Sequence, residues 1–136
     1  MVKVKRTVLL VVMPLLCAGC DTMHAPIYNM TSCPIEIVAS TSKVQHSLGT
    51  PTRVLPGHNS GVLGGDEPVR YEEIIVRDTR NAERRYDENA LAALRPADVP
   101  EDRWAYSDGG LSFLTQEPST ASLDQIAARP CSANVP

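Results

Sequence analysis

The sequence predicts a small, mainly β domain: an antiparallel sandwich or open barrel that carries one or two short helices. Short extended runs rich in β-branched side chains alternate with turn segments containing Gly, Pro and Asn, a spacing typical of all-β domains. Two pairs of these runs carry hairpin signals, and only two segments have helical periodicity. The 136 residues suffice for one domain with one modest hydrophobic core.

Prolines and glycines set the limits of the predicted strands. Pro34 separates the first two, because proline lacks a ladder donor and holds Cys33 in extended geometry. Pro56 and Gly57 predict a turn, since proline presets φ and glycine accepts a positive φ. The segments predicted to be extended are 27–31, 35–40, 44–48, 52–55, 69–77, 82–86, 103–106 and 111–114.

The strongest β signal is a hairpin formed by residues 69–77 and 82–86 around a polar turn. A second hairpin is predicted around the segment Ser107-Asp108-Gly109-Gly110, which supplies the glycines that tight turns need. Its two strands carry the densest aromatic cluster of the chain, which we expect to close the core; an exposed binding face is the alternative. The cluster consists of Trp104, Tyr106 and Phe113.

Two short helices complete the predicted elements. Asp87 is expected to cap the first helix, residues 88–95, because its carboxylate can accept a free N–H of the first turn. Leu91 and Leu94 fall on one face of this helix and should dock on the sheet. The second helix is predicted over residues 122–129.

Four arginines of the first hairpin have acidic neighbours in the sequence. We interpret them as a solvated hairpin with cross-strand charge pairs, each worth a fraction of a kcal/mol. An anion-binding or partner-binding patch is the alternative. The residues concerned are Arg77, Arg80, Arg84 and Arg85, with Asp78, Glu83, Asp87 and Glu88.

The chain lacks the motifs of common enzymes and metal sites. His24, His46 and His58 stand alone, with no HxH or HxxxH spacing and no adjacent carboxylate, so no metal ligand and no cofactor is predicted. No nucleophile motif and no Gly-rich phosphate loop occurs. The sequence therefore predicts a protein that is not an enzyme.

The first 21 residues have the three parts of an export signal. Lys3, Lys5 and Arg6 form a basic start, an apolar run of about ten residues follows, and small residues precede Cys20. The apolar run is too short for a transmembrane helix, which needs about twenty residues. We therefore expect residues 1–19 to be a cleaved signal.

The end of this signal, Leu16-Cys17-Ala18-Gly19-Cys20, resembles the lipobox of bacterial lipoproteins. The resemblance implies that Cys20 becomes the mature N-terminus and carries a thioether-linked diacylglyceryl group and an N-acyl chain. Several acyl chains would give stable membrane attachment. One departure is Cys17, which stands where the family usually has Leu. The alternative is an ordinary secretory signal, cut near Gly19 or Ala25, that releases a soluble protein.

After the signal, we expect a lipidated tether at 20–26, a single β-rich domain at 27–131 and a frayed tail at 132–136. An exported compartment permits disulfides, and assigning Cys20 to lipid leaves Cys33 and Cys131 as a candidate pair. Two unpaired thiols are the alternative. A bridge would close a loop of about a hundred residues.

These features predict a lipid-anchored protein of the bacterial cell envelope, facing the periplasm, with a structural or protein-interaction role. Removal of Lys3, Lys5 and Arg6 leaves 10 basic against 16 acidic side chains, so nucleic acid is excluded as a partner. The expected partners are the membrane, through the lipid, and an envelope protein. Asp21 resembles the enteric signal for inner-membrane retention, with the outer membrane as the alternative. The alternative function is a periplasmic module that binds a small ligand or metal through the loops of His46 and His58.

Overall fold

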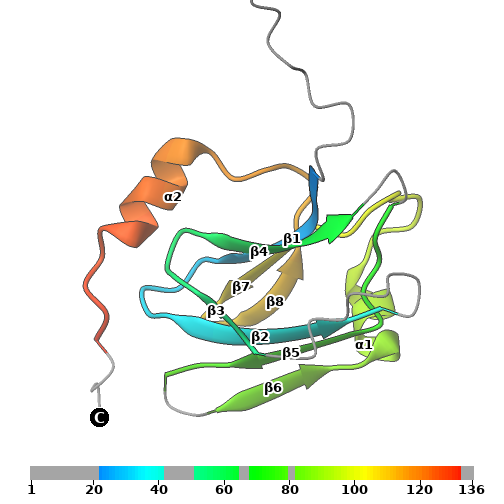
Figure 1. The fold of residues 1–136 in the computed structure, drawn as a ribbon, viewed down its shortest axis with the longest axis horizontal. Coiled ribbons are helices and arrows are strands. Elements are labelled where there is room, and N and C mark those ends of the chain that lie inside the picture. Colours follow the sequence, from blue (N-terminus) through cyan, green and yellow to red (C-terminus); the bar gives the residue numbers. More distant parts are fainter. Residues whose placement is uncertain (1–21, 42–50, 65–67, 80–81, 133–136) are drawn as a thin grey trace, which may run out of the picture.

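The computed structural model describes residues 22–41, 51–64, 68–79 and 82–132. Within them, two four-stranded sheets face each other as a small sandwich, which confirms the predicted mainly β fold (Figure 1). The strands are β1 (Thr22–Asn29), β2 (Ile35–Ser40), β3 (Thr52–Val54), β4 (Asn59–Gly64), β5 (Glu73–Arg77), β6 (Glu83–Tyr86), β7 (Trp104–Ser107) and β8 (Gly110–Phe113). The helices are α1 (Glu88–Leu94) and α2 (Thr120–Ala127), which lie at opposite ends of the sandwich.

One sheet has the strand order β4-β1-β7-β8 and the other β3-β2-β5-β6. Both predicted hairpins are present, as β5–β6 and β7–β8. The first sheet is not wholly antiparallel as predicted, because β1 and β7 run parallel, with Ile27 opposite Trp104. Parallel neighbours need a long crossover connection, and the chain between β1 and β7 contains all four strands of the second sheet, β4 of the first sheet, and α1.

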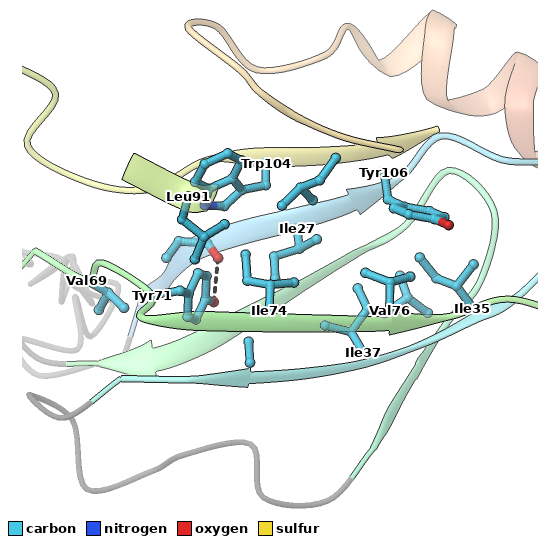
Figure 2. Close-up of a cluster of buried hydrophobic side chains, with 14 residues drawn as sticks. Ile27, Ile35, Ile37, Val69, Tyr71, Ile74, Val76, Leu91, Trp104 and Tyr106 are labelled. Atoms are coloured by element: carbon cyan, nitrogen blue, oxygen red, sulfur yellow. Dashed lines mark hydrogen bonds between the residues drawn. The ribbon is translucent and has the colours of Figure 1, made fainter. Parts of the chain in front are cut away.

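The core lies between the sheets and is formed mainly by β-branched side chains (Figure 2). Ile27 and Trp104 come from the first sheet, and both are fully buried. The Trp104 ring meets Phe113 edge to face, with 5.0 Å between the ring centroids. The aromatic cluster thus closes the core, as predicted. The large aliphatic residues of the second sheet that are fully buried are Ile35, Ile37, Ile74 and Val76.

The first strand begins earlier than predicted. Residues 22–26, assigned to the tether, belong to β1, which pairs with β4 from Thr22 onward. A bulge between His24 and Ile27 places Ala25, at a φ of +50°, in the core. Pro26 suggested a linker, but proline is also compatible with a bulge, where the ladder is already interrupted. The expected edge strand at 44–48 lies outside the described residues.

The predicted strand 69–77 is shorter than expected, because its first part pairs with a loop. The Tyr71 N–H donates to Asp102 Oδ2 at 2.8 Å, and the Asp102 N–H donates to the Val69 carbonyl at 3.0 Å. Asp102 is fully buried and also accepts two bonds of 2.7 Å from Arg95. The Tyr71 hydroxyl donates to the Ala25 carbonyl at 2.6 Å, so the same network holds the bulge of β1.

Both helices begin at side-chain caps. Asp87 accepts the N–H of Ala90 at 2.8 Å, as predicted, and Ser119 caps α2. Leu91 is fully buried, but Leu94 is 42% exposed, so the prediction that both leucines dock is wrong. The helix ends at Leu94, one residue before the predicted end, and its C-cap residue Arg95 forms an ion pair with Asp102.

The buried Asp102 carboxylate predicts a large stability loss for Asp102→Asn. This change removes the charge opposite Arg95, whose side chain is 13% exposed. Loss of one partner of a buried pair typically costs about 3–5 kcal/mol, because the other charge is left uncompensated. Urea unfolding of the variant should give a free energy of unfolding lower by about that amount. Asp98→Asn is the control, since Asp98 is exposed and its φ of +60° suits Asn. Equal stability of the two variants would contradict the role assigned to Asp102.

Candidate functional site

The candidate site is a cavity of about 340 Å³ at one end of the sandwich, which we call the end pocket. It lies where the connection from β1 to β2 and the turns of both hairpins come together. Its size is near the lower limit of small-molecule pockets. The lining residues are Thr31, Ser32, Cys33, Ile35, Asp78, Thr79, Arg84, Tyr106, Asp108 and Ser132.

Tyr106 forms the inner wall of the end pocket. The residue is 2% exposed, and Figure 2 shows its hydroxyl pointing away from Trp104 and toward the end of the core where Ile35 lies. Within the described residues, no side chain or backbone group forms a hydrogen bond with this hydroxyl. Burial raises the pKa of Tyr106, so the phenol keeps its proton at neutral pH and can donate.

Two of the other three buried or half-buried tyrosines have hydrogen-bonded hydroxyls. The Tyr71 hydroxyl donates to the Ala25 carbonyl, and the Tyr86 hydroxyl accepts the Leu111 N–H at 3.1 Å. Tyr106 instead lines the end pocket. The Tyr106 hydroxyl is thus a hydrogen-bonding group directed at the space of the end pocket.

Arg84 provides the positive charge of the end pocket. Its guanidinium carbon lies 5.9 Å from the centroid of the Tyr106 ring. Interaction with Tyr106 and a hydrogen bond to the Tyr86 side chain raise the pKa of Arg84. Gly110 is needed here, because its φ is +112° and a Cβ would lie 2.9 Å from the Tyr86 hydroxyl and 3.2 Å from Arg84 Nη1. A side chain at this position would therefore disturb the arginine.

Two carboxylates provide negative charge. Asp78 follows β5, and its Oδ1 accepts the Ala82 N–H at 3.2 Å, which fixes it in the hairpin turn. Asp108 lies in the tight turn between β7 and β8. Both carboxylates raise the pKa of Tyr106, although burial is the larger cause, so both act electrostatically on the pocket wall. The end pocket therefore presents charges of both signs.

The loop on the opposite wall is held rigidly by Asn29. Asn29 is fully buried, and its Nδ2 donates to the carbonyls of Cys33 and Val54 at 2.8 and 3.0 Å. Its Oδ1 accepts from the backbone N–H and the hydroxyl of Thr31, at 2.9 and 2.6 Å. These bonds fix the wall before any ligand arrives, which lowers the entropic cost of binding.

The predicted disulfide closes the same end of the molecule. Cys33 and Cys131 are bridged, with 4.7 Å between their Cα atoms and a sequence separation of 98. Cys131 is exposed, and Ser132 after it reaches the pocket. The bridge follows α2, in which Ile126 is the one side chain buried. The disulfide therefore holds the C-terminal segment in place beside the end pocket.

The predicted charge pairs of the first hairpin are confirmed for two arginines. Arg77 lies 3.4 Å from Glu83 and 3.8 Å from Glu36, and Arg85 lies 3.3 Å from Glu73. A second cavity, of about 400 Å³, adjoins Arg77 and shares Ile35, Asp78 and Thr79 with the end pocket. Arg80 lies outside the described residues. Arg84 differs from these pairs, because it faces the end pocket.

Of the two histidines on which the alternative function rests, the structure describes only His58. His58 is exposed, with its Nδ1 3.0 Å from the Pro56 carbonyl oxygen, and His46 lies outside the described residues. His24 does have a carboxylate partner, Glu101, at 2.6 Å, which its sequence neighbours did not suggest. Across the described ranges, no group of three or more His, Cys, Asp or Glu side chains is arranged to hold a metal ion.

The predicted lipid site, Cys20, also lies outside the described residues. In the part of the chain that the structure describes, neither helix has the length and apolar character needed to cross a bilayer. No family model, curated protein or solved structure matches this chain.

The end pocket itself was not predicted. The prediction that Tyr106 lies in the core is confirmed for its ring. It did not include the position of its hydroxyl at a cavity. Asp78 and Asp108 were assigned to turns, and Arg84 to a charged hairpin. The pocket forms because β6, β7 and the β1–β2 connection meet, and no local sequence pattern indicates such a meeting.

Removal of the disulfide, by Cys33→Ser with Cys131→Ser, should destabilise the domain by about 4–5 kcal/mol at most, and by 2–4 kcal/mol if strain or residual structure offsets the loop-closure term. Urea unfolding of the double variant measures the loss. Reduced wild-type protein is the matched control and should unfold at the same midpoint. Hydrogen exchange should show the largest local loss of protection in α2. Unchanged α2 protection would contradict its dependence on the bridge.

Proposed function

We propose that the protein is a lipid-anchored component of the bacterial cell envelope, without enzyme activity, whose domain faces the periplasm and interacts with an envelope protein. The disulfide between Cys33 and Cys131 carries this proposal, because such bonds persist in oxidising, exported compartments and are rare in the cytosol. The lipobox resemblance at Cys20 supports it independently. Asp21 favours the inner membrane, on the enteric pattern.

The geometry supports an interaction role at the end pocket. Only Asp21 separates Cys20 from β1, so a lipid on Cys20 would hold the start of β1 close to the membrane. The strand has 8 residues and ends at Asn29, beside the end pocket. At about 3.3 Å per residue, the pocket would lie roughly 25 Å from the start of β1. With β1 directed away from the membrane, the pocket would be open to partners in the periplasm.

The lipid anchor is tested by Cys20→Ala expressed in a bacterial host with its signal intact. The wild-type protein should fractionate with membranes and the variant should not, because the variant lacks the thiol that receives the diacylglyceryl group. Intact mass of the mature wild-type protein should show cleavage before Cys20 and the added acyl mass. Cys17→Ala is the control and should remain membrane-bound. Equal membrane association of the Cys20→Ala protein would refute the anchor.

A second candidate function is that of a small-ligand-binding module. A polar cavity lined by Tyr106, Arg84 and two carboxylates favours it. The site differs from the His46 and His58 loops on which the sequence-based alternative rested, since His58 is exposed and bonded to its own turn.

Thermal-shift screening of the mature protein tests this second function. The panel contains copper, zinc, glycan fragments of the cell envelope, and amino acids and short peptides. We expect a rise in Tm of several degrees with an organic probe, because ligand binding to the native state alone stabilises it. The rise should be smaller in Tyr106→Phe, which keeps the ring but lacks the hydroxyl. An equal rise in Tyr106→Phe, or no rise with any organic probe, would refute binding in the end pocket.

A further inference from the structure

We infer that the ligand of the end pocket is a small zwitterion, a free amino acid or a short peptide with unblocked ends. The inference rests on the second proposed function and names its ligand class. Arg84 and the Tyr106 hydroxyl would hold the ligand carboxylate, and Asp78 and Asp108 would face the ligand ammonium group.

The carboxylate position follows from two donors on one wall. The Arg84 guanidinium lies over the Tyr106 ring, at 5.9 Å from its centroid, so both groups border the same part of the cavity. The phenol keeps its proton at neutral pH and has no hydrogen-bond partner within the described residues. A carboxylate would accept from both groups and would be bound by charge-assisted hydrogen bonds.

The position of the ligand ammonium group follows from the two carboxylates of the end pocket, whose charge is opposite to that of Arg84. Asp78 and Asp108 stand in the turns of the two hairpins and border the same cavity as Arg84. A simple anion would meet two carboxylates here, and a simple cation would meet the guanidinium. Like charges brought together inside a pocket are costly, which selects against ligands of a single sign. A ligand with one positive and one negative group can place each of them beside a charge of opposite sign.

Size and the absence of a free aromatic face narrow the ligand further. About 340 Å³ accommodates an amino acid or a dipeptide but is small for a larger peptide. Sugar sites commonly offer an open aromatic face for stacking. Tyr106 is the only aromatic residue among the described lining residues, and at 2% exposure its face is covered. A carbohydrate would therefore lack its usual platform.

The test is a titration of isotope-labelled mature protein, disulfide intact, followed by amide NMR shifts. The probes are alanyl-alanine, its N-acetylated and C-amidated form, and glucose. We expect alanyl-alanine to shift the amides of Ser32, Thr79 and Gly109 saturably, with at least tenfold weaker binding of the blocked dipeptide. Glucose should shift none of them.

Two variants and a control locate the binding. Arg84→Gln and Tyr106→Phe should each weaken alanyl-alanine binding, by tenfold or more and by several-fold respectively. Arg85→Gln should leave it unchanged, because neighbours on β6 point to opposite faces and Arg85 pairs with Glu73. Each variant must retain the dispersed spectrum of the folded domain.

The outcomes separate this inference from the functions on which it depends. Equal binding of the free and blocked dipeptides, or no saturable shift with alanyl-alanine, would overturn the inference that the ligand is a zwitterion. Glucose binding at the same amides, lost in Tyr106→Phe, would also overturn it while supporting a ligand-binding module. The lipid anchor is decided separately by the membrane fractionation of Cys20→Ala.

Discussion

The structure depends on one buried carboxylate, Asp102. Its interactions join segments that are far apart in the sequence: the end of α1, the segment before β5 and, through Tyr71, the bulge of β1. Asp102 precedes β7 of the first sheet, and Tyr71 precedes β5 of the second sheet, so the bond between them links the two sheets. Arg95 also lies 5.6 Å from the centroid of the Trp104 ring, so the ion pair borders the largest side chain of the core. Charge pairing at this end thus sets how the two sheets meet.

At the opposite end of the sandwich, a disulfide and the hydrogen bonds of the Asn29 side chain hold the segments together. Asn29 and the disulfide fix the connection from β1 to β2, and Tyr86 joins β6 to the edge of β8 by accepting the Leu111 N–H. This end contains the end pocket, which is lined by charged and polar side chains. A firmly held scaffold with one open end is a common arrangement for binding proteins, because the site is formed before the ligand arrives.

Local chemistry made much of this fold predictable. The β2 strand, both hairpins and the Asp87 cap follow from β-branched runs, turn glycines and a capping carboxylate. The wrong predictions concern positions whose structure depends on residues far away in the sequence. Thr22 to Pro26 form a strand because β4 pairs with them, and Leu94 is exposed because Arg95 binds a carboxylate seven residues later. The end pocket was missed for the same reason, since its donors and acceptors come from four separate segments.

The disulfide also imposes an order on the maturation of the domain. Its two cysteines are separated by 98 residues, and the second is near the last described residue. A chain that emerges from its N-terminus therefore presents Cys33 as a free thiol until nearly all of the domain has followed. The β1–β2 connection, with its Asn29 bonds, can form in that interval, whereas the C-terminal wall of the end pocket cannot. The end pocket thus gains the lining residue Ser132 only after the rest of its wall has emerged.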